Sequence, residues 1–173
     1  LYQILFILFC SSTVWGQSKA IDSLLIILSS AKKDSNKVKL FTELATNYVG
    51  INNTAKAMVY ADSSEILAST LHYNTGKANA IVLKGQVESK KGNWENAVSK
   101  FKLAAKLYHE LGDKIAEANT FTSIAFEYTK KDSYVEALRY RHAAMMLYEE
   151  LNNKDGLMTT YLGIGSVYGN LAN

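Results

Sequence analysis

The chain repeats itself every forty residues. Leu71, Leu111 and Leu151 are spaced by forty positions, and each opens a segment whose later positions match their counterparts. Small residues recur in register after these leucines: Gly85, Ala125 and Gly165, then Ala97 and Ala137, then Ala104 and Ala144. A fixed period of this length predicts stacked repeats, because a single unit cannot bury its apolar face alone.

The spacing of apolar residues predicts two helices in each unit and no strand. We expect first helices at about 36–51, 75–91, 114–131 and 154–171, and second helices at about 54–72, 94–110 and 134–150. Short polar turns containing Gly or Asn separate them, and proline is absent from the chain. The sequence therefore predicts an all-α fold, a right-handed α-solenoid of antiparallel helix pairs with about three and a half repeats.

The mid-helix glycines predict where the paired helices pack most closely. A glycine inside a helix costs about 1 kcal/mol relative to alanine, so its recurrence indicates that a partner helix lies against the gap. Ala97 and Ala137 offer a complementary small surface on the second helix. Trp94 and Tyr134 begin that helix, and we expect them to fill the space between the pair as core residues.

The charge balance excludes two classes of partner. The 173 residues include 19 basic and 16 acidic ones, a formal net charge of +3, and the lysines are scattered along the chain. Nucleic-acid-binding proteins concentrate Lys and Arg on one face, so we expect no nucleic-acid partner and no membrane contact by the mature repeats. The single cysteine, Cys10, has no partner for an internal disulfide.

The first residues differ from the rest. Residues 1–16, LYQILFILFCSSTVWG, form a short apolar run followed by small polar residues and a terminal glycine. A membrane-spanning helix needs about twenty apolar residues, so this segment is interpreted as a signal peptide. The mature chain is then exported, to the periplasm or another extracytoplasmic space. Residues 17–35 are expected to form an N-terminal packing helix.

Over residues 36–173, approximately, the pattern resembles the tetratricopeptide repeat (TPR) family. In the TPR frame, the small position of the first helix is matched by Ala45, Gly85, Ala125 and Gly165, and its aromatic position by Tyr48, Tyr128 and Tyr168, with Glu88 as the exception. The first alanine of the second helix is matched by Ala57, Ala97 and Ala137. Phe101 matches the aromatic slot of that helix, whereas Arg141 departs from it. The units lie at about 38–77, 78–117 and 118–157, with a half unit at 158–173. The period of forty and the missing terminal proline resemble a forty-residue subclass of the family.

The whole arrangement also resembles the N-terminal extracytoplasmic region of bacterial TPR-containing sensor histidine kinases and regulators. In that group, a membrane helix and a kinase or DNA-binding domain follow the repeats. No residue of this chain matches those parts, so no kinase activity is assigned to it. Because the repeat frame stops half a unit early, we expect a fragment of a longer protein. The apolar face of helix 154–171 should then be partly exposed, at Leu157, Tyr161, Ile164 and Tyr168.

No motif in the sequence predicts enzyme chemistry. Gly163, Gly165 and Gly169 superficially resemble a phosphate-binding loop, but such a loop follows a strand, whereas these glycines fall inside a predicted helix. The three histidines, at positions 72, 109 and 142, lack the spacing of metal ligands. We expect no catalytic residue, no cofactor and no metal, so the chain is predicted not to be an enzyme.

The TPR resemblance implies that a protein or peptide partner binds in a concave groove lined by the first helices. Carried over by register, the partner-binding positions are Lys39, Thr42, Thr46, Asn79, Val82, Gln86, Asn119, Thr122 and Phe126, with Lys90 and Lys130 at the rim. Asn79 and Asn119 are either donors and acceptors for the backbone of an extended peptide or merely tolerated exposed residues. Thr42 and Thr46 stand where some family members carry a carboxylate-binding Lys and Asn, so that clamp is not expected here.

Two functions follow from this interpretation. The first is a non-catalytic binding module that forms the extracytoplasmic sensory or interaction part of a longer bacterial signalling protein. The alternative is a free-standing exported scaffold that assembles envelope proteins. The sequence downstream of Asn173 distinguishes the two.

Overall fold

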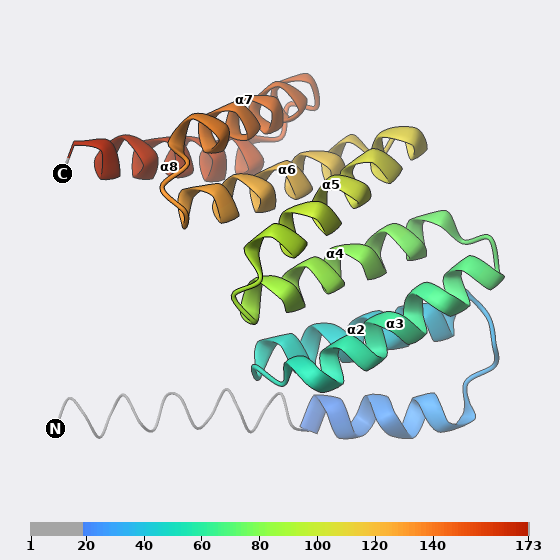
Figure 1. Cartoon of the computed structure of the whole chain (residues 1–173). Coiled ribbons are helices and arrows are strands. Elements are labelled where there is room, and N and C mark those ends of the chain that lie inside the picture. Colours follow the sequence, from blue (N-terminus) through green and yellow to red (C-terminus); the bar gives the residue numbers. More distant parts are fainter. Residues whose placement is uncertain (1–18, 173) are drawn as a thin grey trace, which may run out of the picture. The chain divides into compact units, whose positions relative to one another are not determined.

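All regular secondary structure in the computed structural model, which describes residues 19–172, is helical. The helices are α2 (Ser35–Gly50), α3 (Thr54–Thr70), α4 (Asn74–Lys90), α5 (Trp94–Leu111), α6 (Lys114–Thr129), α7 (Tyr134–Glu150) and α8 (Lys154–Leu171), preceded by a helical segment at 19–30 (Figure 1). Every helix expected from the repeat is present, with ends within two residues of the predicted ones. The predicted signal peptide at 1–16 lies outside the described residues.

Six short loops join α2 through α8, and all have the same backbone conformation. Each contains one residue with positive φ, and these residues recur every twenty positions: Asn52, His72, Gly92, Gly112, Asp132 and Asn152. The residue that follows donates its N–H to the carbonyl five positions earlier, as Asn53 does to Tyr48 at 2.8 Å. This is the Schellman arrangement that closes a helix around a left-handed residue. The backbone therefore repeats every twenty residues, although the sequence repeats every forty.

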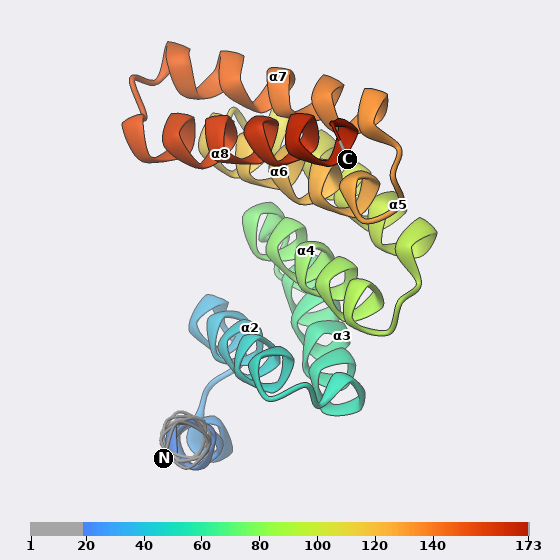
Figure 2. The ribbon, with the colours of Figure 1, turned by 90° about the vertical axis from the view of Figure 1, so that its left-hand side faces the viewer.

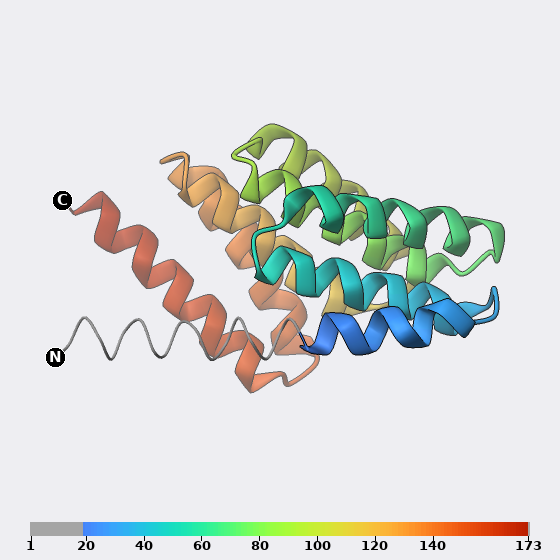
Figure 3. The same ribbon diagram turned by 90° about the horizontal axis from the view of Figure 1, so that it is seen from below.

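The chain forms two compact units, residues up to Leu83 and residues from Lys84 onward, and the division falls within α4. In the first unit, α2 and α3 form an antiparallel pair, seen from below in Figure 3. Ala45 and Ala61 are fully buried in a cluster with Leu83. Small residues at this contact allow α2 and α3 to approach closely.

Aromatic residues and the helical segment at 19–30 complete the first unit. Tyr48 stacks on Tyr60 with ring centroids 5.5 Å apart and nearly parallel planes. The segment at 19–30 lies alongside α2 (Figures 1 and 3), and its residues Ile21 and Leu24 are buried. Through these two side chains, the helix at 19–30 covers part of the first unit.

The second unit contains α5 to α8. Helix α6 packs against both α5 and α7, and α8 packs against α7 (Figure 2). The core between α6, α7 and α8 consists of Ala118, Ala144 and Tyr148, surrounded by Phe121, Leu147 and Leu157. Tyr128 stacks on Tyr140 at 5.8 Å, as Tyr48 stacks on Tyr60 in the first unit. Alternating small and aromatic residues therefore hold each pair together.

The gap at Gly85 is filled by a residue other than the one predicted. A β-carbon at Gly85 would lie 2.6 Å from the Phe101 ring, so the ring occupies the space that the glycine leaves. Trp94 is only half-buried, with its edge against Tyr128 at 6.2 Å, and Tyr134 donates its hydroxyl to Asp132 at 2.7 Å. The assignment of Trp94 and Tyr134 to the core was wrong. Both stand at the first residue of their helices, beside the loop, whereas Phe101 lies two turns further along.

The glycines of α8 are not equivalent to Gly85 in their surroundings. No atom lies within 4 Å of a β-carbon built at Gly165 or Gly169, apart from the helix itself and chain neighbours. Helix α8 nevertheless runs unbroken through Gly163, Gly165 and Gly169. This confirms that the glycine-rich segment is part of a repeat helix and not a phosphate-binding loop.

Candidate partner-binding groove

The predicted groove residues of the first unit lie on α2 and α4. Lys39 and Thr46 are exposed, whereas Asn79 and Val82 are half-buried. The hydroxyl of Thr42 lies 3.0 Å from the Ser64 hydroxyl on α3, so it also holds the helix pair together. The residues of this unit offer two exposed polar side chains, and their role in binding stays a prediction.

In the second unit, four predicted groove residues form a row along α6. Asn119, Thr122, Phe126 and Lys130 follow one another at helical spacing, and Phe126 is 54% exposed. The Lys130 ammonium lies 5.5 Å from the centre of the Phe126 ring, within the range of a cation–π contact. On α4, Gln86 is half-buried and Lys90 is exposed. The row on α6 combines an amide, a hydroxyl, an apolar ring and a cation on one helix face.

A buried carboxylate holds the end of this row in place. Glu127 is only 1% exposed, accepts a hydrogen bond from the Ser89 hydroxyl, and pairs with Lys130 at 3.2 Å. Its counterparts forty residues away, Val87 and Val167, are fully buried valines. A buried carboxylate needs such partners, because an unpaired charge inside a protein is costly. Sequence reasoning missed Glu127, although a charged residue at a valine position was a visible signal.

Tyr148 extends the row from a second helix. Its hydroxyl donates to the Asn119 side-chain oxygen at 2.6 Å, and its ring covers Gly156 of α8. Burial raises the pKa of the Tyr148 phenol, and a hydrogen bond with Thr122 and the charge of Arg141 offset part of that rise. A residue of α7 thus reaches the groove positions of α6, which the assignment of the groove to first helices alone did not foresee.

Arg141 lies two turns before Tyr148 on α7. It is 7% exposed, and its guanidinium group covers Gly163 of α8, where a β-carbon would overlap it. Burial lowers the pKa of Arg141, and the neighbouring Tyr148 offsets part of this. The Nε atom has no hydrogen-bond partner in the structure. Sequence reasoning noted Arg141 only as a departure from an aromatic position.

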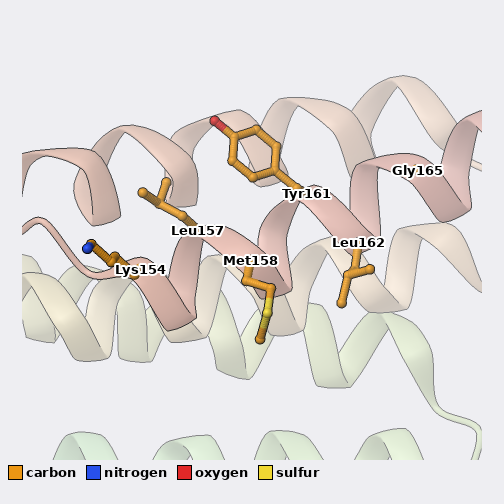
Figure 4. A pocket seen from close by; sticks show the side chains of 6 residues that line it. All are labelled: Lys154, Leu157, Met158, Tyr161, Leu162 and Gly165. Carbon is orange, nitrogen blue, oxygen red and sulfur yellow. The ribbon is translucent and has the colours of Figure 1, made fainter.

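A second exposed surface lies on α8. A shallow hollow is lined by six residues that all belong to this helix: Lys154, Leu157, Met158, Tyr161, Leu162 and Gly165 (Figure 4). Met158, Tyr161 and Leu162 are each more than half exposed. Of the four residues predicted to be partly exposed on this helix, Tyr161 and Tyr168 are more than half exposed and Leu157 and Ile164 are half-buried.

Two further observations bound the chemistry of residues 19–172. Within this range, no group of three or more His, Cys, Asp or Glu side chains is placed to hold a metal ion. None of the helices described there is long and apolar enough to cross a membrane.

The fold is similar to that of several solved helical-repeat proteins. Aspartyl phosphate phosphatase F from Bacillus subtilis matches with a TM-score of 0.79 and 20% identity, over 90% of this chain and 40% of that chain. A signal transduction ATPase with a tetratricopeptide repeat sensor, from Pyrococcus horikoshii, matches with a TM-score of 0.79 and 18% identity, over 90% of this chain and 24% of that one. A Rap protein complexed with competence and sporulation factor matches with a TM-score of 0.74 and 21% identity, over 88% and 43%.

These likenesses establish the fold class. The neighbours are TPR-like helical-repeat proteins, which confirms the predicted α-solenoid of antiparallel helix pairs. This chain spans less than half the length of each of the three. No protein-family model and no curated protein matches the sequence.

Proposed function

We propose that this chain is a non-catalytic module that binds a protein or peptide partner along α6. The observation that carries the proposal is the exposed Phe126 within the row Asn119–Thr122–Phe126–Lys130. An aromatic side chain on a polar helix face is typical of an anchor for a partner, because aromatic residues are enriched among residues that dominate binding energy.

The neighbours of Phe126 suit a peptide ligand. The Glu127 carboxylate restrains Lys130 beside the ring, so that a cation stands at a defined place next to an apolar contact. Asn119 supplies an amide that can donate to a peptide carbonyl while its oxygen accepts from Tyr148. Fixed polar groups around an aromatic anchor reduce the entropy lost on binding.

The similar structures support a binding role without assigning a partner. One of them is complexed with competence and sporulation factor, and another carries a TPR sensor. We further propose that these repeats belong to the forty-residue TPR subclass, since the sequence period is forty and the loops recur every twenty.

The proposal is tested with a displayed library of random peptides, selected for binding to the purified chain. Enriched peptides are expected to bind the Phe126→Ala variant at least tenfold more weakly, because the anchor is removed. Val135, 79% exposed on α7, gives the matched control: Val135→Ala should leave affinity unchanged. Both variants should keep their helical circular dichroism. Equal affinity of the Phe126→Ala variant and the wild type would place binding elsewhere.

We also propose that the module acts outside the cytoplasm as the sensory or interaction part of a longer bacterial signalling protein. The apolar segment at 1–16 supports export, and the arrangement of repeats supports the sensory role. Fusion of residues 1–33 to a reporter enzyme that is active only after export should give activity in a bacterial host. A coding sequence that continues into a membrane helix and an output domain supports the sensor. One that stops after a capping helix supports the exported scaffold.

A further inference from the structure

Arg141 and Gly163 depart from the repeat together. Forty residues before Arg141 stands Phe101, which is 2% exposed and fills the gap at Gly85. Arg141 instead lies against the following first helix, α8, at Gly163, whose counterparts forty and eighty residues earlier are Ser123 and Leu83. Any side chain at position 163 would occupy the place of the guanidinium group. The glycine therefore provides the space in which the guanidinium lies.

Within residues 19–172, no carboxylate neutralises the charge of Arg141. Its Nε is buried without a hydrogen-bond partner, and no carboxylate among the described residues pairs with the group. Arginine stays protonated in proteins, so the site carries a nearly buried positive charge. A buried charge that lacks a partner destabilises the fold, and an anion that reaches it would remove that cost.

By register, Gly163 lies beside the α8 positions that correspond to the predicted groove residues of α6. Thr159 and Ser166 are the α8 counterparts of the groove residues Asn119 and Phe126, and they lie four residues before and three residues after Gly163 on the same helix face. Tyr148, seven residues after Arg141 on the same side of α7, covers Gly156 of α8 and donates its hydroxyl to Asn119 of α6. The guanidinium group of Arg141 and the phenol hydroxyl of Tyr148 therefore lie next to α8 and α6, the helices that carry the candidate groove positions.

We propose that Arg141, with Tyr148 and Asn119 beside it, binds a carboxylate group of the partner at the α6–α8 edge of the groove. A carboxylate is planar and accepts two parallel hydrogen bonds from a guanidinium edge. This inference rests on the proposed binding function and names one subsite of it.

The chain offers a direct test, because Arg139 and Arg141 are its only arginines. The side-chain Nε–H signals of both are followed by nitrogen–proton NMR during addition of sodium acetate, against sodium chloride at equal ionic strength and pH. The Arg141 signal should shift saturably, together with the backbone amides of Gly163 and Asn119. Arg139 is exposed on the same helix and should show only the small linear drift of the chloride reference.

Variants separate binding from a general salt effect. In Arg141→Met, the saturable shifts of Gly163 and Asn119 should disappear, and in Arg141→Lys the acetate midpoint should rise at least tenfold, since lysine cannot form the paired contact. Arg139→Met removes the same charge two residues away and should retain them. Parallel drift of both arginine signals in the wild type, or saturable shifts that persist in Arg141→Met, would overturn the proposal.

Two model peptides identify the source of the carboxylate. Acetyl-Ala-Ala-Ala with a free C-terminus carries only a chain-terminal carboxylate, and acetyl-Ala-Glu-Ala-amide carries only a side-chain one. A saturable Arg141 shift with either peptide supports the site, and silence of both peptides and of acetate overturns it. If peptides bind the Phe126→Ala variant and the wild type equally while the Arg141 signal still responds to acetate, the proposed function is contradicted and the carboxylate site is not.

Discussion

Helices α6 and α8 occupy the same place in successive repeats of the second unit, yet a face that is covered in α6 is exposed in α8. Ala125 of α6 is fully buried, whereas its counterpart Gly165 is exposed. Tyr128 is half-buried in a stack with Tyr140, whereas its counterpart Tyr168 is 57% exposed. The two helices present similar residue types, and what differs is whether a second helix covers them.

This difference teaches that a position in the repeat does not set its own burial. Helix α7 covers α6, and among the residues that the structure describes no helix covers the corresponding face of α8. The same residue types therefore contribute to stability in α6 and form an open apolar surface in α8. Matched substitutions in the two helices measure that contrast.

The largest difference in stability between matched substitutions is expected at the small-residue position of the repeat, Ala125 in α6 and Gly165 in α8. Ala125→Leu adds three heavy atoms to a fully buried site and should lower the free energy of unfolding by about 3 kcal/mol, at the upper end of overpacking costs. Gly165→Leu should not destabilise the chain, because nothing lies within 4 Å of its β-carbon position. Urea unfolding monitored by circular dichroism measures both. Equal destabilisation by the two changes would mean that α8 is covered in solution.

The aromatic position should show the next largest effect. Tyr128→Ala removes the stack on Tyr140 and the edge contact with Trp94, and should cost about 2 kcal/mol, less than for a fully buried ring. Tyr168→Ala should cost less than about 0.5 kcal/mol, as is usual for exposed positions. Thermal unfolding of both variants measures the difference. A Tyr168→Ala variant as unstable as Tyr128→Ala would contradict the comparison.

Replacing Gly165 or Gly85 by alanine should change the free energy of unfolding in opposite directions. Gly165→Ala should stabilise the chain by about 1 kcal/mol, because alanine favours the helix and meets no neighbour. Gly85→Ala should destabilise it, since the added carbon would lie 2.6 Å from the Phe101 ring. Double variants with Phe101→Leu provide the control, because the smaller side chain should relieve the penalty at position 85. A stabilising Gly85→Ala would show that the ring moves aside without cost.

Glycine substitutions in the loops that precede α7 and α8 should change the stability of the chain equally. In a Tyr134→Phe background, which lacks the hydroxyl that bonds to Asp132, Asp132→Gly and Asn152→Gly each remove the strain of a left-handed non-glycine residue and should stabilise the chain by roughly 0.5 kcal/mol. Denaturation midpoints of the two variants should rise equally above that of the Tyr134→Phe chain. Clearly unequal shifts would place part of the difference between the helices in their loops and not in what covers them.

The helices and their loops were predictable from sequence because they depend on local patterns. The period placed all seven helices, and Asn and Gly in the turns pointed to left-handed residues; His72 and Asp132 adopt the same conformation with less favourable side chains. The filling of the Gly85 gap was not predictable from spacing alone. It depends on which side chain of the partner helix, Trp94 or Phe101, stands opposite the glycine in space.

The contacts of the candidate groove residues were predictable only in part for the same reason. Residues of α6 follow from the register, because one helix face is defined by its own sequence. Tyr148 and Arg141 belong to α7 and lie over Gly156 and Gly163 of the next helix, and Tyr148 bonds to Asn119 of α6. Their contribution arises from contacts between helices. A comparison of equivalent positions in the repeats does not reveal such contacts.

The six equivalent loops have a consequence for how such a chain can change in length. Since each helix from α2 to α7 ends at a left-handed residue followed by the same backbone hydrogen bond, a segment of forty residues between two such loops is bounded by equivalent junctions on both sides. Duplication or deletion of one such segment recreates a junction that already exists. The gene can therefore gain or lose whole helix pairs without inventing a new turn.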